Sequence, residues 1–312
     1  MVKTLMRFIS EERSSSLISH SLAFDAAREA LIAASQPASA SFPTVIGHGS
    51  AASDRFTVKS GATSDLAGIK IGSYWPGNGQ KNLPRHSSLI LLFDQEIGRI
   101  GAVIEGGGVN AYRTAAADAV AADALARPDA SSLTVFGTGH QAIYECAAVS
   151  RVRPIDTISI VGRTPERVQS FIGALSEHGL TAQPAIAQRA CEDADIIITA
   201  TTARAPLFEA SWVQPGTHIA TMGSDAQGKQ ELPPELFSRG SLFCDLPEQS
   251  RVIGEFQHLP DQHAATTAIG SVLTGDSAGR TNKDQITIFD SSGIALQDLY
   301  IAIALLQEES SQ

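Results

Sequence analysis

The residues Leu133–Cys146, LTVFGTGHQAIYEC, carry the strongest fold signal in the chain. An apolar run, Leu133–Phe136, leads into the pattern G-x-G-x-x-A, whose fixed positions are Gly137, Gly139 and Ala142. The first glycine permits a tight turn, the second lets a pyrophosphate approach the backbone, and the small third residue lets helix and strand pack closely. The free N–H groups of the following helix favour a phosphate. We therefore expect a strand–turn–helix unit that binds a dinucleotide.

The segments after this turn alternate between apolar runs and helical periodicity. Apolar runs recur as TISIVG (157–162), ADIIITAT (194–201), THIATMG (217–223) and SLFCDL (241–246). Such alternation is typical of βαβ units and a parallel sheet. We predict a Rossmann-type doubly wound parallel sheet, of the α/β class, in residues 114–289.

The remainder of the chain predicts a second, α+β domain. Short β-like runs appear as RFTVKSG (55–61), GIKIGSYW (68–75), SSLILLFD (87–94) and RIGAVIEG (99–106), and DQEIG (94–98) reads as a hairpin turn. Apolar residues at helical spacing precede these runs, and others end the chain. Since 312 residues exceed the usual size of one core, we expect residues 1–113, completed by 290–312, to form this second domain.

Composition narrows the possible partners. The formal net charge is −10 and no basic run occurs, which argues against a nucleic-acid or anionic-membrane surface. The longest apolar runs fall far short of the roughly 20 residues that cross a bilayer. Three scattered cysteines fit reduced, buried thiols, and no cluster has metal-ligand spacing. We expect a cytoplasmic protein that binds no nucleic acid, membrane or metal.

The end of the apolar run TISIVG (157–162) bears on the choice of cofactor. An NAD-selective fold usually places Asp or Glu there, whereas this chain has Gly162, Arg163 and Thr164. A guanidinium can clamp a 2′-phosphate, so we predict that NADP(H) is preferred and that NAD(H) remains possible. The alternative is that Arg163 lies on a solvated loop.

A second feature is YRTAAADAVAADAL (112–125), in which Arg113 and Thr114 open an alanine-rich helix. A helix dipole disfavours a cation at that end, so a surface role for Arg113 is electrostatically awkward. An arginine held there could bind a substrate carboxylate. The hydroxyl of Thr114 and the N–H groups after it could meet a cofactor phosphate.

Three separated segments resemble the ornithine cyclodeaminase/mu-crystallin family, in the family's order. They are residues 112–142, 222–232 (MGSDAQGKQEL) and 286–298 (ITIFDSSGIALQD). The resemblance implies a Rossmann domain flanked by a substrate-binding and dimerisation domain built from both chain ends. It also implies NAD(P)-dependent hydride transfer at the α-carbon of a small amino or imino acid, in a homodimer. Members include ornithine cyclodeaminase, alanine dehydrogenase, imino-acid reductases and mu-crystallin, which binds thyroid hormone.

The resemblance also implies site residues. Lys70 matches the family lysine near the substrate carboxylate, Arg113 matches the arginine beside it, and Asp225 matches the catalytic aspartate. Asp225 follows a predicted strand at its carboxyl end, where it could exchange a proton with the substrate nitrogen, or simply cap a turn. Lys229 could pair with it. The expected cofactor contacts are Gly137, Gly139, His140, Gln141, Ala142, Arg163, Thr164, Thr114, Arg85 and Met222.

Two residues depart from the pattern of ornithine cyclodeaminases. Thr44 stands where those enzymes carry an arginine, and Lys59 stands where they tend to have an apolar residue. An inward Lys59 could replace the missing cation or bind a second carboxylate, and it would repel the terminal ammonium of ornithine. Alternatively, Lys59 could extend into solvent. We therefore favour an imino-acid or ketimine reductase. The alternatives are ornithine cyclodeaminase, which forms L-proline and ammonia, and a non-catalytic NADP-dependent binding protein like mu-crystallin.

Overall fold

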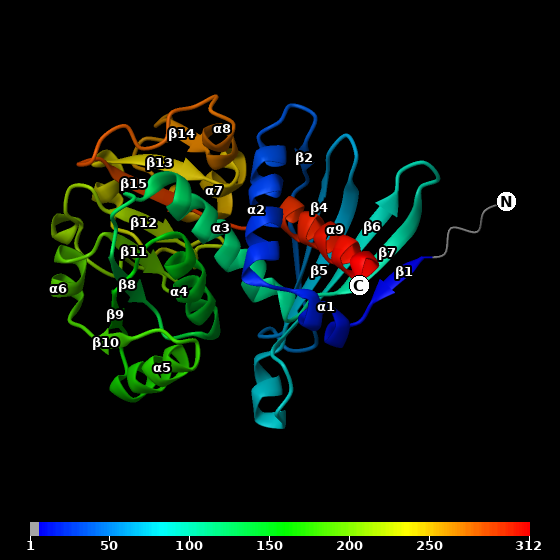
Figure 1. Ribbon diagram of the computed structural model, residues 1–312, viewed down its shortest axis with the longest axis horizontal. Coiled ribbons are helices and arrows are strands. Elements are labelled where there is room, and N and C mark those ends of the chain that lie inside the picture. The colour runs from blue at the N-terminus through cyan, green and yellow to red at the C-terminus, as the bar shows by residue number, and fades with distance from the viewer. Residues whose placement is uncertain (1–5) are drawn as a thin grey trace. The chain divides into compact units, whose positions relative to one another are not determined.

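The computed structural model describes residues 6–312, and its backbone divides into two compact units (Figure 1). Unit 1 consists of Met1–Arg113 and Ile294–Gln312, and unit 2 consists of Thr114–Gly293. Each unit contains its own sheet.

Unit 2 is built on an eight-stranded sheet in which every pair of neighbours is parallel. Its strands are β8 (Ser132–Phe136), β9 (Thr157–Val161), β10 (Ala182–Pro184), β11 (Ile196–Thr199), β12 (His218–Thr221), β13 (Gly240–Cys244), β14 (Thr266–Ala268) and β15 (Ile286–Asp290). The order β10-β9-β8-β11-β12-β15-β13-β14 runs outward in one direction from β8 and in the other from β11. The predicted doubly wound parallel sheet is therefore confirmed.

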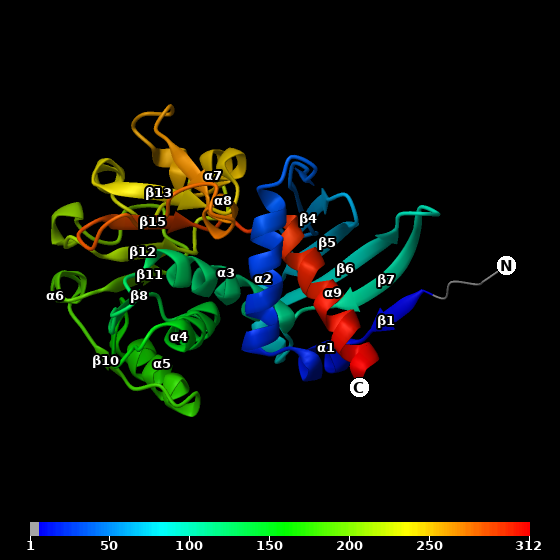
Figure 2. The same cartoon turned by 45° about the horizontal axis from the view of Figure 1, so that its top comes forward.

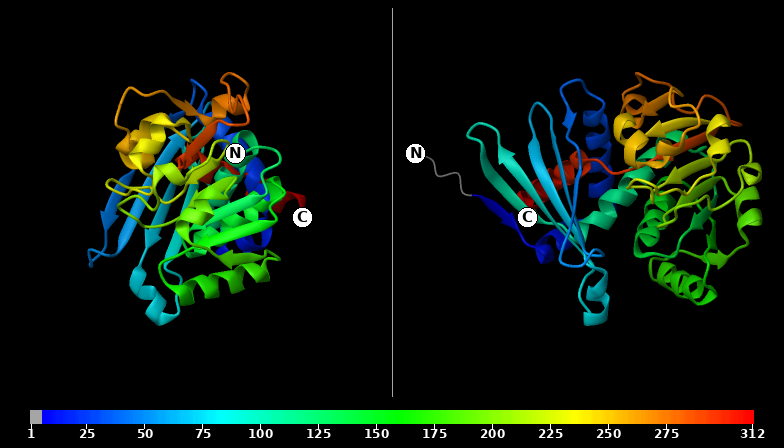
Figure 3. Two further views of the ribbon diagram at one scale, coloured as in Figure 1. Left: turned by 90° about the vertical axis from the view of Figure 1, so that its left-hand side faces the viewer. Right: turned by 180° about the vertical axis from the view of Figure 1, so that it is seen from behind.

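The central strands of this sheet are buried because helices and turns connect every parallel pair. Every residue of β11 and β15 is buried, as their near-continuous apolar sequences require. The connecting helices are α4 (His140–Val152), α5 (Pro165–Glu177), α6 (Ala187–Glu192), α7 (Pro247–Ile253) and α8 (Ile269–Leu273), with 3₁₀ segments η2 (Ala210–Trp212), η3 (Pro234–Ser238) and η4 (Glu255–His258). Figure 3 shows these helices around the sheet.

Unit 1 contains a seven-stranded mixed sheet. Its strands are β1 (Arg7–Ile9), β2 (Ala40–Ser41), β3 (Val45–His48), β4 (Arg55–Ala62), β5 (Ala67–Tyr74), β6 (His86–Asp94) and β7 (Arg99–Glu105). The order is β1-β7-β6-β5-β4-β2, and β3 also pairs with β4. Only the β1–β7 pair is parallel, and the hairpin between β6 and β7 turns at Gly98 with φ of 66°. The other helical elements of unit 1 are α1 (Glu11–Leu17), α2 (His20–Ala34), α9 (Ala295–Ser311) and the 3₁₀ segment η1 (Pro76–Lys81).

Helix α9 packs on one face of this sheet and lies beside α2 (Figure 2). Two glycines permit the close approach of the helix to the strands. A Cβ at Gly68 would lie 2.6 Å from Cδ2 of Leu299, and one at Gly61 would lie 3.3 Å from Cδ2 of Leu296. The C-terminal segment of the chain is therefore built into unit 1, against β4 and β5.

The opposite face of the sheet is apolar. Strand register places its residues in two rows across the strands, Val45–Val58–Ile71–Leu89 and Ile69–Leu91–Val103–Phe8. Several of them are exposed in the single chain, notably Val45 at 58% and Phe8 at 55%. An apolar surface of this extent is typical of a protein–protein contact.

Helix α3 spans Val109–Leu125, so the prediction that Arg113 and Thr114 open it was wrong. The helix begins one turn earlier, because the carboxylate of Glu11 accepts hydrogen bonds from the N–H groups of Gly107 (2.8 Å) and Gly108 (2.6 Å). This acceptor comes from a distant part of the sequence and caps the helix start. As a result, the N–H groups after Thr114 belong to the helix interior, where intrahelical bonds occupy them.

Among residues 6–312, no helix is both long and apolar enough to cross a bilayer.

Candidate active site

The predicted glycine turn joins β8 to α4 in unit 2. Gly137 has φ of 124°, and a Cβ there would lie 2.5 Å from the carbonyl oxygen of Ala200, just after β11. The turn therefore sits where the strand order reverses, between β8 and β11, which is the usual ligand position in open α/β sheets. A side chain at Gly137 is excluded both by this contact and by its φ.

The turn has the features of a phosphate cradle. A Cβ at Gly139 would meet nothing within 4 Å, so the backbone is open there. Gly139 is also the N-cap of α4 and supplies no side-chain cap, and the N-terminus of a helix favours an anion such as a phosphate. Ala142 is fully buried, as close helix–strand packing requires. These residues fit the pyrophosphate of a nicotinamide dinucleotide.

Other residues predicted to contact the cofactor lie around this turn in unit 2. Arg163 and Thr164 are exposed after β9, and the segment Gly162–Thr164 contains no carboxylate. Gln141 donates to Oε1 of Glu145 (2.7 Å), which directs its side chain along α4. The rings of His140 and Tyr144 are 5.0 Å apart between centroids, so His140 packs on the same helix.

Three predicted cofactor contacts lie elsewhere. Met222 directly follows β12, is 8% exposed, and donates its N–H to Thr199 (2.8 Å). Thr114 is the first residue of unit 2, inside α3. Arg85 belongs to unit 1, where its guanidinium lies beside Gly79 in η1, since a Cβ at Gly79 would be 2.4 Å from Nη2.

Unit 1 brings Lys70 and Arg113 together in a buried cluster. Nζ of Lys70 donates to Oδ1 of Asn110 (2.8 Å), and Nη2 of Arg113 donates to the same oxygen (3.0 Å). Both cations are largely buried, at 6% and 9% exposure. The side chain of Lys70 extends over Gly72, since a Cβ at Gly72 would lie 3.4 Å from Cε of Lys70.

Asp298, on α9, is the anion of this cluster. Its Oδ1 lies 3.2 Å from Nζ of Lys70 and 3.2 Å from Nε of Arg113. The preceding residue, Gln297, accepts a hydrogen bond from Nη1 of Arg113 (3.3 Å). Asp298 is 2% exposed, so one buried carboxylate contacts both cations.

Lys59 lies on the same face of the sheet as this cluster. In the β4–β5 pair it stands directly opposite Lys70, and directly opposite residues point to one face. Thr44 immediately precedes β3, which begins where Val45 pairs with Val58, and so borders the same stretch of β4. The structure thus gathers Lys59, Lys70 and Arg113, and Thr44 adjoins the first residue of β3.

Burial and charge shift the protonation of this cluster. Burial lowers the pKa of Lys70 from 10.5 to about 8, with Arg113 and Lys59 adding to the effect and Asp298 opposing it. Burial alone would raise the pKa of Asp298, but the charges of Arg113, Lys70 and Lys59 hold that pKa below its usual 3.8. Asp298 is therefore ionised at neutral pH. The pKa of Lys70, about 8, lies close to neutral pH.

Asp225 lies in unit 2, four residues beyond β12. Its carboxylate pairs with Nζ of Lys229 (2.5 Å), the partner suggested by the sequence. Lys229 also donates to the carbonyl of Gly223 (3.1 Å), so this segment closes on itself. The side chain of Asp225 is 58% exposed, which leaves its second oxygen accessible.

A buried carboxylate holds the segment that carries Asp225. Glu231 is 0% exposed and accepts hydrogen bonds from Thr199, Thr201, Thr221 and Gly223. These donors stand at the carboxyl ends of β11 and β12. Glu231 therefore ties the carboxyl end of β11 to that of β12, from which the Met222–Asp225 segment departs.

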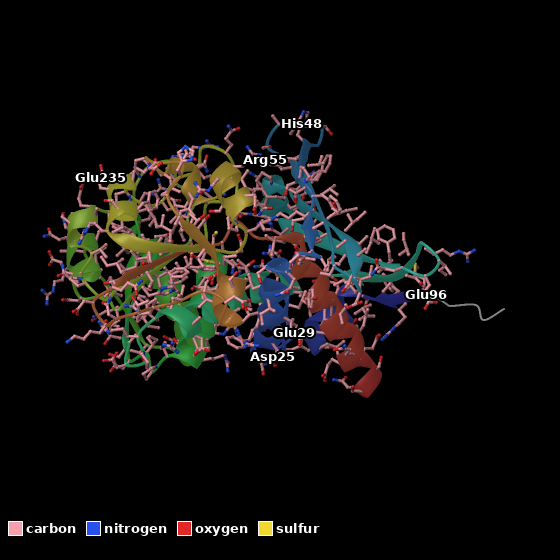
Figure 4. The ribbon with its side chains drawn as sticks, turned by 90° about the horizontal axis from the view of Figure 1, so that it is seen from above. Asp25, Glu29, His48, Arg55, Glu96 and Glu235 are labelled. Carbon is pink, nitrogen blue, oxygen red and sulfur yellow. The ribbon has the colours of Figure 1, made fainter. Side chains whose placement is uncertain are left out.

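Two histidines of the unit 1 sheet, His48 and His86, have other contacts. Exposed His48 pairs with Arg55 at the end of β3 and β4, as Figure 4 shows, and its Nδ1 lies 2.8 Å from the carbonyl oxygen of Gly49. The ring of His86 stacks on Tyr74, with centroids 4.6 Å apart.

Sequence reasoning missed Asn110, Gln297, Asp298 and Glu231. Asn110 stands one turn before Arg113 in α3, a spacing visible only once the helix start is known. Gln297 and Asp298 end the segment ITIFDSSGIALQD, which served above only as a family signature. Glu231 occurs in GKQEL, where a glutamate reads as an ordinary surface charge.

The described part of the chain contains no candidate metal site, and its cysteines are buried. No group of three or more His, Cys, Asp or Glu side chains within residues 6–312 is arranged to hold a metal ion. Cys146, Cys191 and Cys244 are buried free thiols. Burial raises the pKa of each, to about 12 for Cys191, so they stay protonated at neutral pH.

Comparison with known proteins identifies the family. The model of the ornithine cyclodeaminase/mu-crystallin family matches residues 5–311. The iminosuccinate reductase of Paracoccus denitrificans is 34% identical over 97% of this chain and 96% of its own. Its crystal structure in complex with NAD+ superposes with a TM-score of 0.91 at 32% identity, over 98% of this chain and 97% of that chain.

Two further solved structures share the fold along almost the whole chain. An archaeal alanine dehydrogenase dimer with bound NAD superposes with a TM-score of 0.88 at 29% identity, covering 98% of this chain and 96% of that chain. The Δ1-pyrroline-2-carboxylate reductase of Thermococcus litoralis, in complex with NADH and L-proline, also gives a TM-score of 0.88, at 26% identity over 98% of both chains. The chain therefore belongs to the ornithine cyclodeaminase/mu-crystallin family of NAD(P)-dependent enzymes.

Proposed function

We propose that this protein is an NAD(P)H-dependent reductase of α-imino acids that prefers substrates without a distal cation, such as dicarboxylic imino acids. The observation that carries the proposal is the position of Lys59, directly across the strand pair from Lys70 on the face that bears Asp298. Three cations around one carboxylate suit an anionic substrate. The iminosuccinate reductase named above supports the same substrate class.

Arg113 and Lys70 are proposed to hold the α-carboxylate of the substrate. Their side chains are already fixed by Asn110 and Asp298, so little conformational freedom is lost when a carboxylate binds. Arg113 can bind a carboxylate through two N–H groups and thereby orient the imine carbon. Lys59 is proposed to receive the second carboxylate, and Thr44 to border it.

Bound NAD(P)H would supply the hydride that adds to the carbon of the C=N bond. The imine nitrogen gains a proton in the same conversion, and we propose that Asp225 delivers it, with Lys229 keeping Asp225 in place. Lys70, with its lowered pKa, can also give up a proton near neutral pH. The product is the corresponding α-amino acid.

For the cofactor, we propose that NADP(H) binds more tightly than NAD(H). The proposal rests on Arg163 and Thr164, which follow β9 where NAD-selective folds place a carboxylate. Three related structures carry NAD+, NAD or NADH, so NAD(H) is expected to bind as well. Gly137, Gly139, His140, Gln141, Ala142, Thr114, Arg85 and Met222 are proposed as the remaining cofactor contacts.

We further propose that the protein is a homodimer. The apolar face of the unit 1 sheet, formed by the two rows from Val45 to Leu89 and from Ile69 to Phe8, gives it a contact surface. A related alanine dehydrogenase is a dimer.

The test is a comparison of substrates. Oxidation of NADPH and of NADH is followed by absorbance with a dicarboxylic imino acid formed from oxaloacetate and ammonia, and with Δ1-pyrroline-2-carboxylate. L-Ornithine is assayed with NAD(P)+ in the reverse sense. We expect the highest kcat/KM with an imino acid that lacks a distal cation. Efficient release of ammonia from L-ornithine would instead identify an ornithine cyclodeaminase, and tight cofactor binding without turnover would identify a binding protein like mu-crystallin.

A further inference from the structure

We propose that Asp298 is a positioning residue of the imino-acid site: it holds Lys70 and Arg113 side by side and offsets one of the three positive charges there. This inference rests on the proposed function, because it assigns these cations to the substrate. It concerns a residue on α9, outside the segments in which a catalytic role was expected.

One oxygen of Asp298 contacts both cations. Its Oδ1 is 3.2 Å from Nζ of Lys70 and 3.2 Å from Nε of Arg113, so one oxygen serves both. Asn110 repeats the arrangement from α3, since its Oδ1 accepts from the same two side chains. Asn110 on α3 and Asp298 on α9 thus both hold the side chains of Lys70, on β5, and Arg113, on α3.

Charge explains why one of these acceptors is an anion. Lys70 and Arg113 are largely buried, and Lys59 stands opposite Lys70 in the strand pair. Without a carboxylate, these like charges would face one another in a site with little water, which is costly. The carboxylate of Asp298 reduces the net charge of the three cations to +2. This charge would be balanced by the two negative charges of a dicarboxylate substrate.

The surroundings of Lys70 contain no competing anion within hydrogen-bonding distance among the described residues. Arg113, Asn110 and Lys59 face it from α3 and β4, and Thr57 lies beside it over Gly72. Asp298 comes from α9. Removal of the charge at position 298 should therefore favour the neutral amine of Lys70.

The experiment follows Lys70 directly by NMR. The chain has six lysines, so the side-chain Cε resonances of protein labelled with ¹³C-lysine can be resolved and Lys70 assigned with Lys70→Arg. In Asp298→Asn, the pH at which Lys70 titrates should fall by about one unit or more. In Asp298→Glu it should return close to the native value, and in the control Asp25→Asn, an exposed change on α2 (Figure 4), it should not move.

Kinetics give a second readout. The alkaline limb of kcat/KM in Asp298→Asn should shift by the same amount as the NMR titration. Unchanged titration of Lys70 in a folded Asp298→Asn protein would overturn the inference. Because the NMR readout needs no turnover, that result is distinct from a failure of the reductase proposal, which would appear as absent activity in the native protein.

Folding of the variant is itself informative. If Asp298→Asn alone does not fold but Asp298→Asn with Lys70→Met does, the uncompensated lysine is the cause and the inference stands. If neither folds, Asp298 has a structural role that is independent of Lys70, and the inference is overturned.

Discussion

Glu231→Gln tests how unit 2 holds the segment that carries Asp225. The two carboxylate oxygens of Glu231 divide their donors: Oε1 accepts from the N–H of Thr201 (2.7 Å), and Oε2 accepts from the N–H of Gly223 (2.9 Å). Glutamine keeps the shape but turns one acceptor into an NH₂ donor. The hydroxyls of the surrounding threonines can rotate and accept a hydrogen bond from this NH₂ group, whereas a backbone N–H can only donate. One of the two N–H groups therefore loses its acceptor in either orientation of the amide.

The magnitude follows from this count. A buried donor left without a partner costs about 1 to 3 kcal/mol, and the remaining bonds lose the strength that a charged acceptor gives them. We expect the free energy of unfolding to fall by about 2 to 4 kcal/mol. For a domain of this size, each kcal/mol lowers the melting temperature by roughly 2 to 4 °C, so calorimetry should show a decrease of roughly 4 to 16 °C.

The matched control is Glu235→Gln, an exposed glutamate four residues along the chain (Figure 4). It removes the same charge without removing a buried acceptor, so its melting temperature should stay close to that of the native protein. Equal melting temperatures for the two variants would refute the role given to Glu231.

Three further predictions concern the cofactor, the proton and pH. Arg163→Asp should reverse the preference for NADP(H) over NAD(H), costing NADP(H) about one to two decades of affinity in a fluorescence titration, and equal affinities in the native protein would count against it. Asp225→Asn should lower kcat by about two to four orders of magnitude while the Kd of the cofactor stays unchanged, and full turnover would reassign Asp225 to a turn cap. Burial raises the pKa of Glu255 from 4.5 to about 7, so its contribution to stability is complete below pH 4.5 and is lost as pH rises through 7; urea unfolding of Glu255→Gln should lack that part of the pH dependence, and an unaltered profile would disprove it.

Local patterns predicted the parallel sheet of unit 2 well, because each signal lies within a few residues. The apolar run before Gly137, the G-x-G-x-x-A turn and the helix after it are contiguous, and their chemistry is set by backbone conformation. The strands β4 to β7 were likewise marked by their own residues and turns.

Features that depend on distant parts of the chain could not be predicted in this way. The start of α3 is set by Glu11, almost a hundred residues earlier, whose carboxylate caps Gly107 and Gly108. The pairing of Asp298 with Lys70 likewise requires α9 to pack on β5, which the sequence gives only as an expectation of contact between the chain ends. In both cases a charged residue looks like a surface residue until its tertiary partner is known.

The most direct test of the proposed substrate class is the effect of Lys59→Met on specificity. The kcat/KM for a dicarboxylic imino acid and for L-ornithine would be measured in the native protein, in Lys59→Met and in the exposed control Lys81→Met. We predict that the native protein prefers the dicarboxylic substrate, and that Lys59→Met alone reduces the ratio of the two kcat/KM values by at least about tenfold, since a close charge contact is worth about 1.4 kcal/mol or more. Efficient conversion of L-ornithine by the native protein, with no effect of Lys59→Met, would contradict it.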